Sequence, residues 1–216
     1  AASSPTIMVT LELTVRPSPT ALPLEIVDAE NVPMVLVPVG EFKMGSADGP
    51  EFDRPVNIFY LNSYYIDKYE VSNASYQACV DANVCTPPKQ SKSAIRESYY
   101  GNPEFGDYPV IAVNWYQADE YCKWRQGSLP SEEQWEKAAR GTNDFIYPWG
   151  NTFNPALLNF CDKNCPMMWA LQDFDDGYED TAPVDMFEGG QSPYGAFNMS
   201  GNVYEWTLDW YDVYPG

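Results

Sequence analysis

The sequence predicts an α+β domain of short strands, about three helices and much irregular structure. Short runs rich in β-branched and aromatic residues occur in the first third of the chain, and three helices with clear capping signals follow. The 14 Gly and 19 Pro among 216 residues indicate many turns and few long helices. A chain of this length suits one domain with appendages and a substantial core.

The expected strands of the domain alternate with turn residues. A Pro-Val-Gly sequence at 38–40 separates the first two. The last two runs follow each other closely in the sequence, so we expect them to pair as a hairpin. The four strands are predicted at residues 34–39, 41–44, 56–60 and 63–66.

Two helices are predicted in the middle of the chain. Ser72 is expected to cap the first, over residues 73–82, and Asn114 is expected to cap the second, over residues 115–126. Apolar residues at i, i+3 and i+7 predict a buried stripe on the second helix. This stripe consists of Trp115, Ala118 and Cys122.

The third helix has the clearest end signals in the chain. Ser131 and Gln134 have the spacing of a capping box, acidic residues occupy the first turn, and Gly141 follows the last turn. Beyond this helix the sequence predicts loops, aromatic clusters and short strands. The residues that we expect to face the core from the helix are Trp135, Ala138 and Ala139.

An alternating segment precedes the domain. We divide the chain into an arm at 1–16, a Pro-rich linker at 17–32 and the domain itself at 33–216. Apolar residues recur at every second position of the arm, which is typical of a strand. This strand can fold back as an edge strand of its own domain or insert into a neighbouring subunit. Its apolar face consists of Ile7, Val9, Leu11, Leu13 and Val15.

The composition excludes several classes of function. A net charge of −19 repels phosphate backbones and anionic membrane surfaces, so nucleic acid is not expected as a partner. The chain has no His, which excludes a Ser-His-Asp triad and His-based zinc or iron sites. No apolar run approaches the ~20 residues of a transmembrane helix. Five Cys in an acidic, aromatic chain favour an oxidising compartment, so we expect a secreted or cell-surface protein.

The five cysteines form two close pairs and one single residue. Cys79 and Cys85 lie across a predicted helix end, and Cys161 and Cys165 enclose a short turn. Both spacings can close a local disulfide if the turn brings the α-carbons to ~5.5 Å. Cys122 then remains, and we expect a free thiol on a buried helix face. A four-cysteine zinc site is the alternative, although paired C-x-x-C spacing is lacking.

Two loops in the last third of the chain carry side-chain oxygens beside glycines. Asp173, Asp175 and Asp176 precede Gly177, an arrangement typical either of a solvated acidic loop or of a calcium loop. The stretch 194–210 can offer side-chain oxygens and carbonyls to a hard cation, or it can simply be a turn that enters the core. The aromatic residues expected to anchor this stretch against the core are Tyr204, Trp206 and Trp210.

Several motifs occur in an order that is typical of one family. They include GNVYEWTLDW at 201–210 and YYIDKYEVSNASY at 64–76. The others are MVLVPVGEFKMGS at 34–46, YPVIAVNWYQADEYCKW at 108–124, SLPSEEQWEKAARG at 128–141, YPWGN at 147–151 and DDGYEDTAPVDMF at 175–187. Together they resemble the formylglycine-generating-enzyme (sulfatase-modifying factor) family, a variant of the C-type-lectin fold, over roughly residues 33–212.

The resemblance implies a C-type-lectin-like fold that holds two calcium ions. In the family each ion is bound by an Asn side chain, a carboxylate and backbone carbonyls. The positions that match the first ion are Asn159, Phe160, Asp176 and Tyr178. Those that match the second are Asn198, Gly201, Val203 and Glu205. All side-chain ligands are present, so we expect two structural calcium ions.

The resemblance does not transfer the family's oxidase activity to this chain. In the family, a cysteine pair that binds copper lies after the GNVWEW signature, in a segment that begins with an R-G-G-S-W-like strand. None of the five cysteines matches that pair, so we expect no copper and a non-catalytic structural or adhesive protein. The alternative is a formylglycine-generating-type copper oxidase whose sequence is truncated here.

That same family segment supplies strands to the central sheet, so we expect an open sheet edge. The arm strand can fill such an edge in a neighbouring subunit, which would build a homo-oligomer or filament. A third reading is a lectin-like module that binds carbohydrate or protein through the loop at 86–108. Its residues that could stack on sugars are Tyr99, Tyr100, Phe105 and Tyr108.

Overall fold

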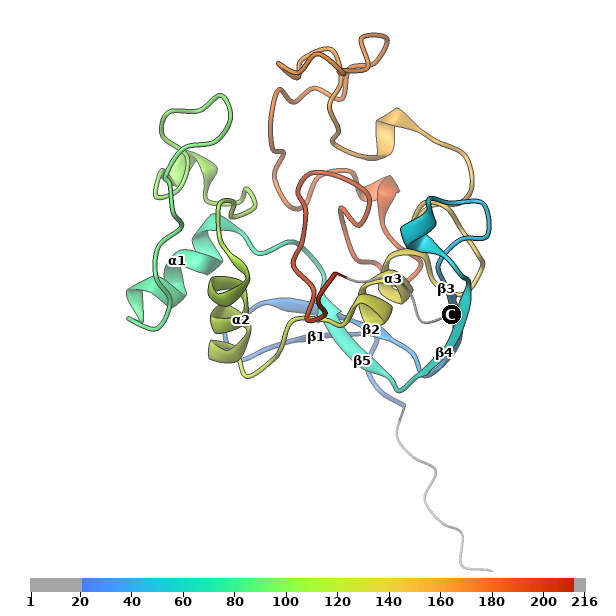
Figure 1. Ribbon diagram of the computed structural model, residues 1–216. Coiled ribbons are helices and arrows are strands. Elements are labelled where there is room, and N and C mark those ends of the chain that lie inside the picture. The colour runs from blue at the N-terminus through green and yellow to red at the C-terminus, as the bar shows by residue number, and fades with distance from the viewer. Residues whose placement is uncertain (1–20, 212–216) are drawn as a thin grey trace, which may run out of the picture.

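The computed structural model describes residues 21–211, except for the side chain of Phe52. The arm strand at 6–16 therefore lies outside the described residues. Two small antiparallel sheets form the base of the domain, at the bottom of Figure 1. The three-stranded sheet has the order β1-β2-β5, and the two-stranded sheet pairs β3 with β4. The strands are β1 (Glu25–Val27), β2 (Pro33–Val37), β3 (Gly40–Met44), β4 (Asn57–Leu61) and β5 (Tyr64–Asp67).

Part of the expected linker belongs to the domain. Residues 25–27 form β1, which pairs with β2 in the register Glu25↔Val35. The backbone N–H of Leu36 donates to the carbonyl of Leu24 at 2.8 Å. The linker prolines precede this short run, so β1 keeps the donors that a sheet ladder needs.

The predicted hairpin between the last two strands is wrong. β4 pairs with β3, with Phe42 opposite Phe59 and ring centroids 6.3 Å apart. β5 instead pairs with β2, and Val35 lies opposite Ile66. Proximity in sequence favoured the hairpin, but the two strands enter different sheets because each finds an antiparallel partner earlier in the chain.

The three helices have the expected caps. They are α1 (Asn73–Asp81), α2 (Trp115–Trp124) and α3 (Glu132–Arg140). The Ser72 side chain accepts a hydrogen bond from the N–H of Ser75, and both α2 and α3 begin with complete capping boxes. These local bonds satisfy helix N–H groups that have no partner within the helix.

The predicted buried stripe of α2 is wrong. Asp119 and Tyr121 are its buried residues, whereas Trp115, Ala118 and Cys122 are only half-buried. The helix turns the Tyr121 ring toward α1, where it stacks on Tyr76 with centroids 5.6 Å apart. The buried cluster between the two helices consists of Tyr76, Cys79, Cys85 and Tyr121.

Helix α3 packs on the sheets as predicted. Ala138 and Ala139 are buried, and Trp135 packs against the same cluster. Lys137 is also buried, and its ammonium donates to the carbonyls of Pro38 at 2.8 Å and Gly40 at 2.9 Å. These bonds fasten the β2–β3 connection to the helix. The buried residues of this main core are Val35, Val37, Ala138, Ala139, Ala196 and Met199.

After α3 the chain consists mainly of loops with short 3-10 turns. Figure 1 shows the orange loops at the end of the molecule opposite the sheets, while the red segment returns toward α3. None of the helices in the described part is long and apolar enough to cross a membrane. The 3-10 turns between residues 21 and 211 are Glu51–Asp53, Pro103–Phe105, Pro155–Leu157 and Glu188–Gly190.

Candidate functional site

The returning segment 198–205 packs directly on the loop that contains Asn159. Asn198 and Asn202 have positive φ values of 54° and 65°, so the backbone doubles back at both residues. A Cβ atom at Gly201 would lie 2.4 Å from the carbonyl oxygen of Asn159, so no side chain fits there. The N–H of Asn202 donates to that same carbonyl at 2.9 Å. The two sets of predicted calcium ligands are thus adjacent.

The amide of Asn198 has a fixed orientation in the second predicted site. Its Nδ2 donates to Glu70 Oε2 at 2.9 Å and to the carbonyl of Val184 at 3.0 Å, which uses both amide hydrogens. The Oδ1 atom therefore faces the opposite way. It is buried and has no hydrogen-bond partner within the described protein. Glu70 Oε1 is also buried and lacks a partner there.

Two carboxyl groups, those of Glu70 and Glu205, lie near each other at this site. Burial and the nearby Glu205 raise the pKa of Glu70 to about 8, against the opposing effect of its hydrogen bonds from Asn202 and Asn198. Desolvation of the carboxyl raises the pKa of Glu205 to about 6, although the residue as a whole keeps exposed surface. Glu205 Oε2 accepts a hydrogen bond from Trp135 Nε1 at 2.9 Å.

The first predicted site has a different hydrogen-bond pattern. Asp176 accepts the N–H of Phe160 through Oδ2 and the N–H of Tyr178 through Oδ1, both at 2.8 Å. Burial raises the pKa of Asp176, and the nearby Asp162 carboxylate adds to this effect. The structure thus brings Asp176 together with Phe160 and Tyr178, beside the buried Asn159.

Two residues of this region, Asp162 and Glu70, were missed by the sequence prediction, and Asn202 was expected only as one of the side-chain oxygens of the stretch 194–210. Asp162 is fully buried and accepts the N–H of Asp176. Asn202 Oδ1 accepts from the N–H of Ala182, while its Nδ2 donates to Glu70 Oε2, both at 2.8 Å. Glu70 lies inside the motif at 64–76, which was the only signal available for it.

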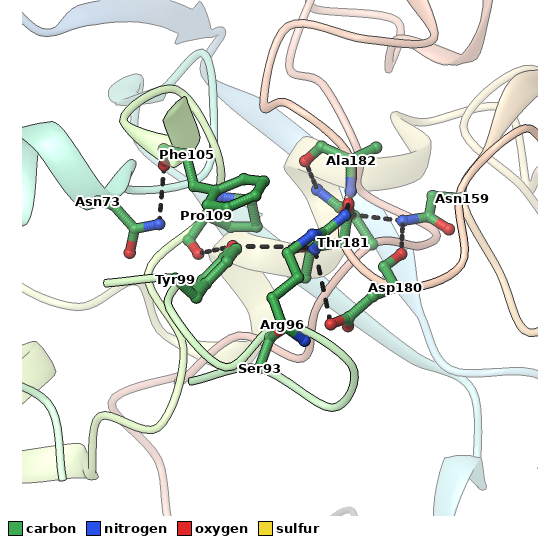
Figure 2. A network of polar contacts seen from close by, with 11 residues as sticks. Asn73, Ser93, Arg96, Tyr99, Phe105, Pro109, Asn159, Asp180, Thr181 and Ala182 are labelled. Carbon is green, nitrogen blue, oxygen red and sulfur yellow. Dashed lines mark hydrogen bonds and ion pairs between the residues drawn. The ribbon is translucent and has the colours of Figure 1, made fainter. Parts of the chain in front are cut away.

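The aromatic residues of the loop 86–108 pack within the domain, so their ring faces are not available to stack on sugars. Figure 2 shows Arg96 between the ring of Tyr99 and the segment 180–182. Tyr99 is fully buried, and the Arg96 guanidinium lies 4.9 Å from the ring centroid of Phe105 and 5.1 Å from that of Tyr108. Arg96 also donates to Thr181 Oγ1 at 3.0 Å. The rings therefore fasten this loop to the rest of the domain.

Both predicted disulfides are present. Cys79 is bonded to Cys85, and Cys161 to Cys165, with α-carbons 5.3 and 5.0 Å apart. Cys122 is free, as predicted, but half-buried rather than buried. Burial raises the pKa of its thiol to about 11, and the nearby Asp67 adds to this effect.

The predicted aromatic anchors of the stretch 194–210 are only partly correct. Trp206 donates its Nε1–H to the carbonyl of Val113 at 3.1 Å. Tyr204, Trp206 and Trp210 are nevertheless exposed. The anchoring role falls to buried residues earlier in the same stretch, Ala196, Phe197 and Met199.

One side-chain oxygen of the second predicted site is available to a hard cation. Calcium prefers carboxylate, amide and carbonyl oxygens, and Asn198 Oδ1 is a buried oxygen that meets no donor in the described protein. At the first site the oxygens of Asp176 already accept backbone N–H groups. No group of three or more His, Cys, Asp or Glu residues between 21 and 211 forms a metal cluster, so a cation here would depend on amide and carbonyl oxygens as well.

The short antiparallel strands, three capped helices and loop-built site define an α+β domain of the formylglycine-generating-enzyme type. Residues 24–216 match the family model of the sulfatase-modifying factor enzyme 1-like domain. The chain therefore belongs to this family.

The relatives of the chain include both formylglycine-generating enzymes and an inactive form. The chain is 30% identical to the formylglycine-generating enzyme of Mus musculus, over 84% of this chain and 59% of that protein. It is 31% identical to that of Thermomonospora curvata, over 83% and 72%. It is 30% identical to the inactive C-alpha-formylglycine-generating enzyme 2 of Bos taurus, over 88% and 75%. The chain thus spans little more than half of the mouse enzyme.

Solved structures show the same fold. PvdO from Pseudomonas aeruginosa superposes with a TM-score of 0.67 at 23% identity, over 88% of this chain and 76% of PvdO. Treponema denticola variable protein 1 superposes with a TM-score of 0.66 at 19% identity, over 89% and 79%. At these identities the likeness concerns the fold alone.

Proposed function

We propose that this chain is a calcium-stabilised, non-catalytic structural or adhesive module of its family, secreted or at the cell surface. The observation that carries the non-catalytic part is the state of the cysteines. Four of the five are in disulfides, and the fifth is a single thiol with a strongly raised pKa. A pair of thiolates, which a copper site of the family's kind requires, has no candidate in this sequence.

The state of Cys122 is open to a chemical test. Because the pKa of its thiol is raised to about 11, we expect iodoacetamide at pH 8 to alkylate it about 100-fold more slowly than a free cysteine. Mass spectrometry of intact protein over time measures the rate. The same protein in guanidinium chloride is the control and should react at the ordinary rate. Equally rapid alkylation of the folded protein would show an accessible, reactive thiolate.

Calcium binding is supported by the geometry of the second site. Asn198 Oδ1 is buried and oriented by two hydrogen bonds from its own amide, and the Glu205 carboxylate belongs to the same predicted ligand set. The ligands would be completed by the carbonyls of Gly201 and Val203. At the first site, Asn159 and Asp176 with the carbonyls of Phe160 and Tyr178 would hold an ion. Such ions would connect loops that have little regular structure.

Self-assembly is supported by open sheet edges. In the part of the chain that the structure describes, β5 pairs only with β2, and β4 only with β3. A cavity of about 430 Å³ runs beside β5, with Tyr64, Ile66, Leu129 and Trp206 in its wall. The apolar residues of the arm strand, from a neighbouring subunit, would pair with β5 and fill this cavity. Such head-to-tail pairing builds filaments when it does not close into a ring.

The assembly proposal is tested by comparing the full chain with one that lacks residues 1–19. Light scattering and negative-stain electron microscopy should show polymers of the first and smaller species of the second. Leu11→Lys places a charge on the apolar face of the arm and should also prevent assembly, whereas Glu12→Lys on the opposite face is the matched control. Identical monomers from all four proteins would contradict the proposal.

The second candidate function is a copper oxidase of the formylglycine-generating type. It is favoured by the enzymes among the relatives, at 30% and 31% identity. It requires a cysteine pair outside the given sequence. Sequencing of the gene downstream of the codon for Gly216 decides between the two. An R-G-G-S strand followed by cysteines would support the oxidase, and its absence would exclude it.

A further inference from the structure

A continuous chain of side-chain hydrogen bonds joins the two predicted calcium sites. Asn159 Nδ2 donates to Asn202 Oδ1 at 2.8 Å. Asn202 Nδ2 donates to Glu70 Oε2 at 2.8 Å. Glu70 Oε2 also accepts from Asn198 Nδ2 at 2.9 Å. Neither Asn202 nor Glu70 is among the predicted ligands, yet both touch an Asn side chain that is.

Asn202 and Glu70, which we call the bridge, each orient one ligand side chain. Asn202 orients Asn159 at the first site, and Glu70 orients Asn198 at the second. The two Nδ2 hydrogens of Asn159 are used by Asn202 Oδ1 and by the carbonyl of Asp180, the latter at 2.7 Å. Those of Asn198 are used by Glu70 and the carbonyl of Val184. An amide with both hydrogens engaged cannot rotate freely, so the direction of its oxygen is set. The direction of each ligand oxygen thus depends on the bridge residues, Asn202 and Glu70.

The backbone leaves little room for the two sites to move independently. Gly201 is in close contact with the carbonyl of Asn159, and Asn202 donates its N–H to that carbonyl. Asn202 Oδ1 and Nδ2 also pair with the N–H and carbonyl of Ala182, at 2.8 and 3.1 Å. Figure 2 shows Asn159 beside Asp180 and Ala182, in the segment that Arg96 holds through Thr181. A shift of one loop therefore displaces the other.

We infer that Asn202 and Glu70 couple the two sites, so that calcium at one site raises the affinity of the other. The physical reason is that the first ion orders the shared amides and carboxylate, and the second ion then binds a site that is already ordered. Asn202 and Glu70 act as positioning residues in this coupling. The inference rests on the calcium binding proposed above and adds to it a connection between the ions.

Isothermal titration with CaCl2 measures the coupling. Asp176→Asn disables the first site, and Glu205→Gln disables the second. In the wild-type background we expect loss of either site to weaken calcium binding at the other by about fivefold or more. Asn202→Gly removes the bridging side chain but tolerates the positive φ at this position. In the Asn202→Gly background, loss of one site should leave the affinity of the other unchanged within about twofold.

The matched control is Asn83→Gly. Asn83 also has a positive φ, of 58°, but it is exposed and distant in sequence from both sites. This variant should retain the full coupling. Should Asn202→Gly fail to fold by circular dichroism, Asn202→Asp takes its place. It keeps the shape of the side chain but replaces the amide donor that faces Glu70 with an oxygen.

The outcomes separate this inference from the function on which it rests. Folded wild-type protein that takes up no calcium would refute the calcium proposal and the coupling together. Two ions that bind independently, or that weaken each other, would leave the calcium proposal standing and overturn the coupling. Coupling that persists in the Asn202 variants would also overturn it, because the bridge would then be irrelevant.

Discussion

The two predicted calcium sites have the same kinds of ligand but differ in how the protein satisfies them. At the first site, both carboxylate oxygens of Asp176 accept backbone N–H groups of neighbouring residues. At the second site, Asn198 Oδ1 and Glu70 Oε1 are buried and meet no donor between residues 21 and 211. A buried acceptor without a partner costs about 1–3 kcal/mol. If calcium binds as proposed, we therefore expect the second site to depend on the cation more than the first.

The positions of the two sites in the fold explain this difference. The first lies in a loop with local support, because the Cys161–Cys165 disulfide and the buried Asp162 close it. The second connects segments far apart in the sequence, since Glu70 and Asn198 are 128 residues apart. A cation at the second site would therefore stabilise the tertiary structure, whereas one at the first would stabilise a loop.

Removal of calcium should have the largest effect. A ligand at 100 times its Kd stabilises the folded state by about 2.7 kcal/mol for each site. For a domain of this size, each kcal/mol shifts Tm by about 2–4 °C. We therefore expect EGTA to lower Tm by at least about 5 °C, as measured by differential scanning calorimetry. Glu205→Gln should remove more of this difference than Asp176→Asn. Equal effects of the two variants on this Tm difference would contradict the expectation that calcium at the second site contributes more to stability than calcium at the first.

Gly201→Ala should have the next largest effect. Its Cβ would lie 2.4 Å from the carbonyl oxygen of Asn159, so the loop must shift. Overpacking of this kind costs about 1–3 kcal/mol. Chemical denaturation measures the loss of stability. Gly127→Ala serves as a reference, because its φ is not positive and its new Cβ would meet only the carbonyl oxygen of Cys122, at 3.6 Å. A smaller loss at Gly201 than at Gly127 would contradict the close packing of the two loops.

Loss of the Cys161–Cys165 disulfide should affect the first site selectively. Paired replacement by serine opens a short loop and costs about 2 kcal/mol at most. Calcium affinity at the first site should fall more than at the second in a titration of the variant. The matched control is the paired replacement of Cys79 and Cys85, which lie in a separate buried cluster. A uniform loss at both sites would show that the disulfide supports the whole domain.

Asp176→Asn should have the smallest effect on the calcium-free protein. The amide oxygen of Asn can still accept one of the two backbone N–H groups, so the expected cost is about 1 kcal/mol. Urea unfolding in the presence of EGTA measures it. A loss above about 3 kcal/mol would indicate that the charge of Asp176 holds the loop.

Local signals predicted the helices better than they predicted the sheets. The caps of α1, α2 and α3 depend on residues within three positions of each other, and all three are confirmed. The hairpin was wrong because strand pairing is decided by the whole set of strands. The buried stripe of α2 was wrong because contact with α1, through Tyr76, selects the face that is buried.

The predicted ligand positions came from sequence motifs. The side-chain hydrogen bonds that connect these positions could not be predicted in this way. Glu70 and Asn202 are 132 residues apart, and no pattern in either motif indicates that their side chains meet. Lys137 has the spacing of a last-turn basic residue exposed to solvent, yet it is buried on two carbonyls. Such contacts depend on how the loops pack, which the sequence pattern does not contain.

Native mass spectrometry of the chain in a calcium-containing volatile buffer counts the calcium ions that each chain holds. We expect a mass that corresponds to two calcium ions per chain, and to one ion after Glu205→Gln. The wild-type mass in EGTA is the reference. A metal-free mass at saturating calcium, for protein that circular dichroism shows to be folded, would show that calcium does not stabilise this chain.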